Sequence, residues 1–122
     1  DCSAAIVQGA DFSEAVLWLA SLDRVDARES TFAGADLRNV SFSDADLTAA
    51  GLDGVDLTGG SLVGADLTDA DLTGAILVEA DLTGAVLSDT ELAAVDIYDT
   101  VLREADLKTT ALGGTDLQNA TF

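Results

Sequence analysis

The sequence contains no proline and no histidine, and it has only one cysteine and five basic residues among 122. Without proline, no backbone N–H donor is lost within the chain. Cys2 cannot form an internal disulfide. We expect it to be a small core residue, and a disulfide to another molecule is the alternative. Histidine, a second cysteine and a phosphate-binding loop are all absent, so the sequence predicts no catalytic, metal or cofactor site, and we expect a protein that is not an enzyme.

Long apolar runs are missing as well. No stretch approaches the roughly 18 residues that indicate a membrane-spanning helix. No basic and apolar N-terminal segment indicates a signal peptide, so we favour a cytoplasmic location.

Large apolar residues return every five residues along the whole chain. Of the 25 positions from Cys2 to Phe122 with this spacing, 17 are leucine and four are phenylalanine. A helix turns about 100° per residue and a strand alternates with a period of two, so neither keeps such residues on one face. The repeat therefore indicates a different geometry.

Each five-residue unit consists of a small residue, the residue directly before the central one (here called the preceding residue), a large central residue and two turn residues. The small and central residues are two apart, so they share one side of an extended segment. The preceding residue between them is most often Asp. Among 24 units the second turn residue is Gly in eight, Asn in two and Asp in four. Those residue types tolerate the positive φ of a type II turn.

If each unit turns the chain through a right angle, four units close a square coil of 20 residues. The chain then holds about six coils of four units, stacked about 4.8 Å apart, with small and central residues packed inside. We predict an all-β solenoid that forms a single domain over residues 1–122. Its repeat continues to both ends, which favours either part of a longer protein or a rod that docks through its ends, including an end-to-end homodimer.

The unit Ala65-Asp66-Leu67-Thr68, with Gly at the second turn position of later units such as Gly74, resembles the repeat of the pentapeptide-repeat family. The resemblance covers the whole chain. It implies a right-handed quadrilateral β-helix that is filled by its own side chains, and therefore no inner pocket for catalysis.

Negative charge dominates the surface. The chain has 23 acidic residues, and residues 39–102 contain 13 carboxylates and no basic residue. That segment would span about 15 Å of rod, over which duplex DNA carries about nine charges. Direct binding of nucleic acid is therefore disfavoured, because the charge has the wrong sign.

Two interpretations of the acid remain open. Some pentapeptide-repeat proteins inhibit or protect DNA gyrase, so the resemblance implies a DNA mimic that binds gyrase or another DNA-binding protein. This chain is shorter than those proteins and lacks an evident C-terminal dimerisation segment. The other interpretation is hydration or salt adaptation. Folded at 20 residues per coil, the four faces beginning at residues 1, 6, 11 and 16 carry five, seven, five and six acids. This even spread favours hydration.

The candidate anionic surface consists of Asp residues directly before central residues. They are Asp26, Asp36, Asp46, Asp56, Asp66, Asp71 and Asp81. Residues 20 apart would stack, and each unscreened contact between two carboxylates would cost about 0.9 kcal/mol in water at about 4.8 Å. Such a ladder could hold Ca²⁺ or Mg²⁺, but the glycine-rich calcium-binding nonapeptide is absent and we expect no metal site.

Apolar residues at outward positions indicate a candidate contact patch for a protein partner whose identity the sequence does not specify. Ile76, Val78, Tyr98 and Trp18 all fall on the fourth face. Scattered surface apolar residues are common, which is the simpler interpretation. A short helix over residues 13–20 that caps the rod is a local alternative.

The stacked carboxylates predict a fold that is more stable in high salt. Salt screens the repulsion between exposed charges, so the melting temperature should rise as KCl is increased to molar concentrations. Thermal unfolding followed by circular dichroism measures this directly. A melting temperature that stays flat or falls would contradict the stacked arrangement.

Overall fold

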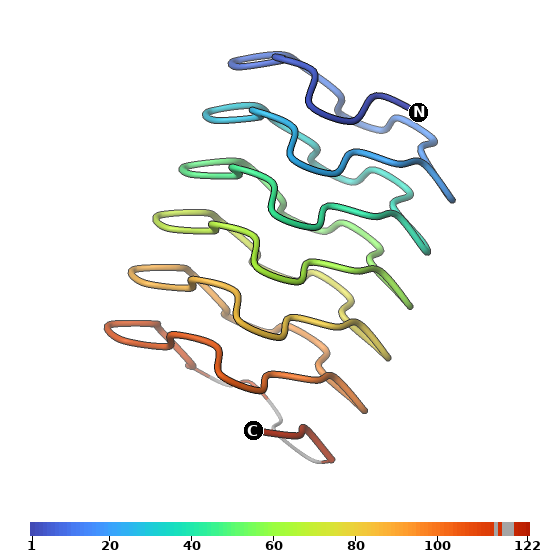
Figure 1. Ribbon diagram of the computed structural model, residues 1–122. Coiled ribbons are helices and arrows are strands. Elements are labelled where there is room, and N and C mark those ends of the chain that lie inside the picture. The colour runs from blue at the N-terminus through green and yellow to red at the C-terminus, as the bar shows by residue number, and fades with distance from the viewer. Residues whose placement is uncertain (114, 116–118) are drawn as a thin grey trace.

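The computed structural model describes residues 1–113, 115 and 119–122. The chain winds as a stack of similar coils, with its two termini at opposite ends of the stack (Figure 1). Every described β-bridge is parallel and joins residues 20 apart, from Ile6–Asp26 to Val101–Thr121. Each bridge pairs one preceding residue with the preceding residue of the next coil. The described residues contain no helix and no strand longer than one residue. The predicted coil of 20 residues is confirmed in this spacing.

Backbone hydrogen bonds between coils connect the stack. In the unit around Leu67, Leu67 N–H donates to the Val86 carbonyl at 2.8 Å and Asp69 N–H donates to the Ser88 carbonyl at 3.1 Å. Asp66 N–H donates in the opposite direction, to the Ala45 carbonyl at 2.9 Å. Three of the five N–H groups in a unit thus connect neighbouring coils. Proline would remove a donor at any of these positions.

A tight turn closes every described unit. In the same unit, Ala70 N–H donates to the Leu67 carbonyl at 3.0 Å. The second turn residue has a φ between 54° and 69° in every described unit, which confirms the predicted positive φ of a type II turn. Residues such as Glu14, Leu19 and Ala94 also adopt it, although a left-handed conformation costs an L-residue about 1–2 kcal/mol. In most described units, including those of Glu14 and Leu19, the N–H of this residue donates to a carbonyl of the next coil, and this bond favours the uniform conformation.

The small and central residues fill the interior as predicted. Central residues from Leu37 to Leu87 are at most 1% exposed. Phe32 stacks on Phe12 with ring centroids 5.0 Å apart and meets the edge of Phe42 at 5.7 Å. The prediction for Cys2 is wrong, because this residue is exposed in the first coil, where one side of the core is uncovered.

Threonine at the small position is accommodated by a repeated hydrogen bond. The Thr90 hydroxyl donates to the Leu67 carbonyl at 2.8 Å, and the Thr100 hydroxyl donates to the Leu77 carbonyl at 2.7 Å. Both threonines are fully buried. Because a buried hydroxyl without a partner is costly, these bonds explain how a polar residue can replace alanine in the core.

The alternative of a helix over residues 13–20 is wrong. Ala15 N–H and Ala20 N–H close two successive turns of the repeat, and Val16 bridges Asp36 in the next coil. The five-residue pattern of central residues therefore overrides the helical propensity of this segment.

The neighbouring residues Ala93 and Ala94 provide a matched test of the turn. Ala94 has a φ of 57°, whereas Ala93 is not in the left-handed region. Ala94→Gly should stabilise the fold by about 0.5–1 kcal/mol, because glycine relieves the positive φ. Ala93→Gly should destabilise it by a similar amount, because only the unfolded chain gains freedom. Denaturant unfolding of both variants measures the two signs, and equal signs would contradict this account.

Candidate functional site

The described residues enclose no cavity. In the same part of the chain, no group of three or more acidic or cysteine side chains is placed to hold a metal ion. Within the described ranges, no helix has the length and apolar character that crossing a membrane requires. The candidate site is therefore the outer surface of the coils.

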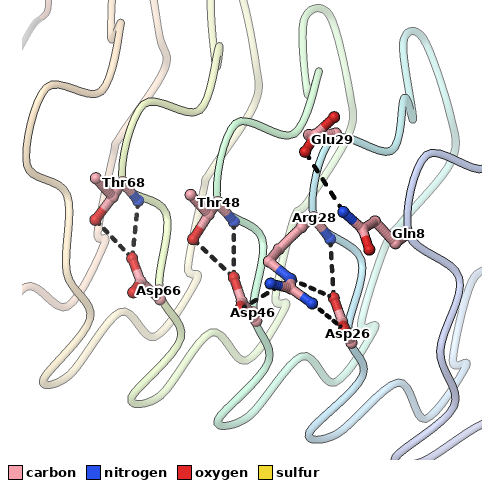
Figure 2. A network of polar contacts seen from close by, with 8 residues as sticks. All are labelled: Gln8, Asp26, Arg28, Glu29, Asp46, Thr48, Asp66 and Thr68. Carbon is pink, nitrogen blue, oxygen red and sulfur yellow. Dashed lines mark hydrogen bonds and ion pairs between the residues drawn. The ribbon is translucent and has the colours of Figure 1, made fainter.

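The fifth N–H group of each unit, that of the first turn residue, has no place in the ladder between coils. In the units of Asp46 and Asp66 it donates to the carboxylate two residues earlier: Thr48 N–H lies 3.1 Å from Asp46 Oδ1, and Thr68 N–H lies 3.0 Å from Asp66 Oδ1. Figure 2 shows both pairs in neighbouring coils. Every described Asp at the preceding position accepts this bond: Asp1, Asp11, Asp26, Asp36, Asp46, Asp56, Asp66, Asp71, Asp81, Asp96 and Asp106.

Threonine after the central residue strengthens this turn. The Thr48 and Thr68 hydroxyls donate to the same Oδ1 atoms of Asp46 and Asp66, at 2.7 and 2.6 Å. An Asp side chain that bonds the backbone two residues later is a recognised local motif. From the sequence these residues were predicted only as surface charges, although the frequent Asp-Leu-Thr triplet was a signal for this structural role.

The candidate anionic residues do not form one continuous surface. Asp26, Asp46 and Asp66 form a column on the second face, and Asp36 bridges Asp56 on the fourth face. The two remaining members, Asp71 and Asp81, lie on the third and first faces and stack on other residues. The structure therefore brings the seven together only as two short columns and two separate positions.

Basic side chains neutralise part of this charge. Arg28 contacts Asp26 Oδ2 at 2.6 Å and Asp46 Oδ2 at 3.5 Å, so it connects two coils (Figure 2). Arg38 contacts Asp36 at 2.6 Å in the same way within its own unit. Between Asp46 and Asp66 the corresponding residues are threonines, so these two carboxylates face each other without such a cation.

These contacts change the titration of a few carboxyl groups. The hydrogen bond from Arg28 lowers the pKa of Asp26, and the hydrogen bond from Arg38 lowers the pKa of Asp36, below the ordinary value of 3.8. Hydrogen bonds from Ser13 lower the pKa of Asp11. A carboxyl group whose pKa falls on folding stabilises the fold above its unfolded pKa, and this contribution is lost as the pH drops through the lowered value.

The candidate contact patch divides into two parts of the fourth face. Val78 and Tyr98 are in adjacent coils, where Glu79 N–H donates to the Tyr98 carbonyl at 3.0 Å, and Ile76 is in the same unit as Val78. Trp18 is on the same face and is 57% exposed, but Arg38 and Thr58 separate it from Val78 in the stack. The 20-residue spacing of the bridges places all four residues on one face, but it does not bring Trp18 into contact with the other three.

Comparison with known proteins agrees with the repeat geometry. A family model for pentapeptide repeats matches residues 20–59 and 52–89, in eight copies. No curated protein matches the sequence significantly.

Solved structures share the architecture. Rfr23, a pentapeptide repeat protein from the cyanobacterium Cyanothece 51142, is 22% identical over 97% of this chain and 88% of its own, with a TM-score of 0.67. The pentapeptide repeat protein alr5209 from Nostoc PCC 7120 is 30% identical over 91% of this chain and 83% of its own, with a TM-score of 0.57. Such proteins are known to form right-handed quadrilateral β-helices. QnrB1, described as a plasmid-mediated fluoroquinolone resistance protein, is 21% identical over 90% of this chain and 66% of its own, and its TM-score of 0.49 supports no functional argument.

Substitutions of Asp66 should separate its two roles. Asp66→Asn keeps an oxygen acceptor for Thr68 N–H and removes one charge from a repulsive column, so stability should be unchanged or slightly higher. Asp66→Ala removes the acceptor and should cost about 1 kcal/mol. Thermal unfolding at fixed salt compares the two variants. An equal loss in both would mean that the charge, and not the acceptor, stabilises the turn.

Proposed function

The chain belongs to the pentapeptide-repeat family, and from this membership we propose that it is a non-catalytic, strongly acidic protein-interaction or scaffold module that needs no cofactor. The module is a right-handed quadrilateral β-helix of about six coils, consistent with 122 residues at 20 per coil. Its partner is a protein that contacts a rigid, anionic outer surface.

One observation carries this proposal: the carboxylates before the central residues are held in place by the backbone. Asp46 and Asp66 each accept a backbone N–H and a threonine hydroxyl, and their backbones bridge from one coil to the next. Binding to a side chain that is already ordered loses less conformational entropy than binding to a mobile one. A regular array of ordered charges is therefore well suited to contact a partner.

Hydration or adaptation to salt is the favoured reason for the acidity. An uncharged Asn could accept the same backbone bond, so the hydrogen bond alone does not explain the prevalence of Asp. Acid also occupies turn positions that make no such bond, including Asp69 and Asp99, and it is spread over all four faces. A high net charge keeps a protein hydrated and soluble.

A DNA-mimicking modulator of gyrase, or of another DNA-binding protein, is the second candidate. The observation that favours it is the segment of residues 39–102, in which 13 carboxylates occur without a basic residue. Its charge per unit length matches or exceeds that of duplex DNA, which carries about one charge per 1.7 Å. A protein with a cationic DNA-binding channel would recognise such a surface by charge.

A gyrase supercoiling assay distinguishes the two candidates. The folded protein would be added across a micromolar range, beside a variant in which Asp46, Asp56 and Asp66 become Asn. This variant retains the turn acceptors, so it should fold. A control in which Asp69, Asp89 and Asp99 become Asn removes the same charge from turn positions.

For an interaction module whose acid serves hydration, we expect no effect of the folded protein on supercoiling. Inhibition, or protection of gyrase from a drug, that is lost in the first variant and kept in the control would establish mimicry by the ordered carboxylates. Equal loss in both variants would mean that only net charge matters.

A further inference from the structure

We propose that Ile76, Val78 and Tyr98, here called the apolar centre, dock a cationic protein segment that carries a large apolar side chain between two lysines or arginines. The inference rests on the proposed interaction function and specifies the chemistry of the partner. It requires neither gyrase nor any other DNA-binding protein.

The apolar centre is exposed and falls within two adjacent coils. Ile76 is 38% exposed, Tyr98 is 48% exposed, and Val78 is partly exposed. Val78 and Tyr98 are in adjacent coils at the same position of the unit, and the Val78 carbonyl accepts Gly59 N–H at 2.9 Å. The three side chains therefore project from one face of a backbone that hydrogen bonds hold on both sides.

Ile76 is not explained by the needs of the fold. It occupies the preceding position, where Asp56 and Asp96 in the adjacent coils each accept a backbone N–H from their own turn. Isoleucine has no oxygen to accept the N–H of Val78, so this unit gives up a stabilising bond and exposes an apolar side chain instead. Other units also have an apolar residue at this position. Val86 and Val101 are half-buried and on other faces, whereas Ile6 and Val16 are exposed in the first coil, and Val16 is on the same face as Ile76.

Carboxylates surround the apolar centre. Asp56 and Asp96 flank Ile76 directly in the stack. Glu79 and Asp99 follow Val78 and Tyr98 at the turns. No basic residue occurs between residues 39 and 102. An apolar core with a charged rim is the usual layout of a protein-binding surface, and this rim selects a partner of positive charge.

A second copy of this chain is a poor match for the same place. Each copy has a net charge of −18, so two such surfaces repel each other.

The other apolar part of the fourth face, around Trp18, has a different charge environment from the apolar centre, because residues 16–20 carry no charge and Arg38 lies in the next coil. Asp36 stacks on Val16 but is paired with Arg38, so the rim of carboxylates without a basic residue distinguishes the apolar centre.

Two synthetic peptides test the proposal with the intact chain. One alternates lysine and leucine, and the other alternates lysine and serine with the same length and charge. The chain has one tyrosine and one tryptophan, so the ring signals of Tyr98 and the indole signal of Trp18 are identified in a proton NMR spectrum without further assignment. Tyr98 reports on the apolar centre, and Trp18 is the internal control.

We expect the lysine–leucine peptide to shift the Tyr98 signals and to leave Trp18 unchanged. It should bind at least about tenfold more tightly than the lysine–serine peptide, a factor that corresponds to about 1.4 kcal/mol. Equal affinities, or a shift confined to Trp18, would overturn the proposal. Tyr98 signals that broaden with protein concentration in the absence of peptide would assign the surface to a second copy, and would also overturn it.

The substitution Ile76→Asp should change the affinity for the peptide in opposite directions under the two explanations of binding. Asp is the residue found at this position in the adjacent coils, so the variant should fold. If the apolar centre binds the peptide, affinity for the lysine–leucine peptide should fall at least about tenfold. If charge alone binds it, the added carboxylate should raise affinity. Ile6→Asp, the same change on the second face, is the matched control and should not weaken binding.

Failure of this test can be told apart from failure of the interaction function. If neither peptide shifts the Tyr98 signals and both peptides dissociate in 0.5 M salt, their binding is non-specific charge attraction. This result would overturn the docking site, whatever the outcome of the gyrase assay. A specific Tyr98 response without any effect on gyrase would support the docking site and remove the mimicry candidate.

Discussion

The backbone ladder between coils is the interaction on which the rest of this structure depends. In an inner unit such as that of Leu67, three N–H groups donate to a neighbouring coil and a fourth closes the turn. The same bonds explain the absence of proline and the positive φ of residues as unsuited to it as Leu19. In such a unit only one N–H remains outside this pattern, and where Asp precedes the central residue its carboxylate accepts that N–H.

The five-residue period was sufficient to predict the coil, the turn and the core. The small and central residues, such as Ala65 and Leu67, were placed inside because they are two apart in an extended segment. The period could not predict the local environment of Cys2, whose exposure depends on its place in the first coil. Nor could residue type alone predict the positive φ of Glu14 or Leu19, because there the hydrogen bonds between coils override the preference of the residue.

The candidate site was predicted less well, for a physical reason. Charge is visible in a sequence, but the partner of a carboxylate is not. Asp66 and Asp69 are identical residues three apart, yet Asp66 accepts the N–H and hydroxyl of Thr68, whereas Asp69 is at the turn with a φ of 59°. The described Asp residues at the preceding position are therefore ordered by the backbone of their own turn, which the residue type alone does not reveal.

This distinction shows where specificity can reside in a repeated fold. When many units satisfy the same backbone requirement with the same residue, as the units with Asp at the preceding position do, that residue describes the fold and carries little information about a partner. A unit that gives up the bond, as the unit of Ile76 does, accepts a loss of about 1 kcal/mol in turn stability. Many units share the ladder, so the stack tolerates such a loss at a few positions. Apolar departures surrounded by ordered carboxylates are consequently the positions where one acidic rod can differ from another in what it binds.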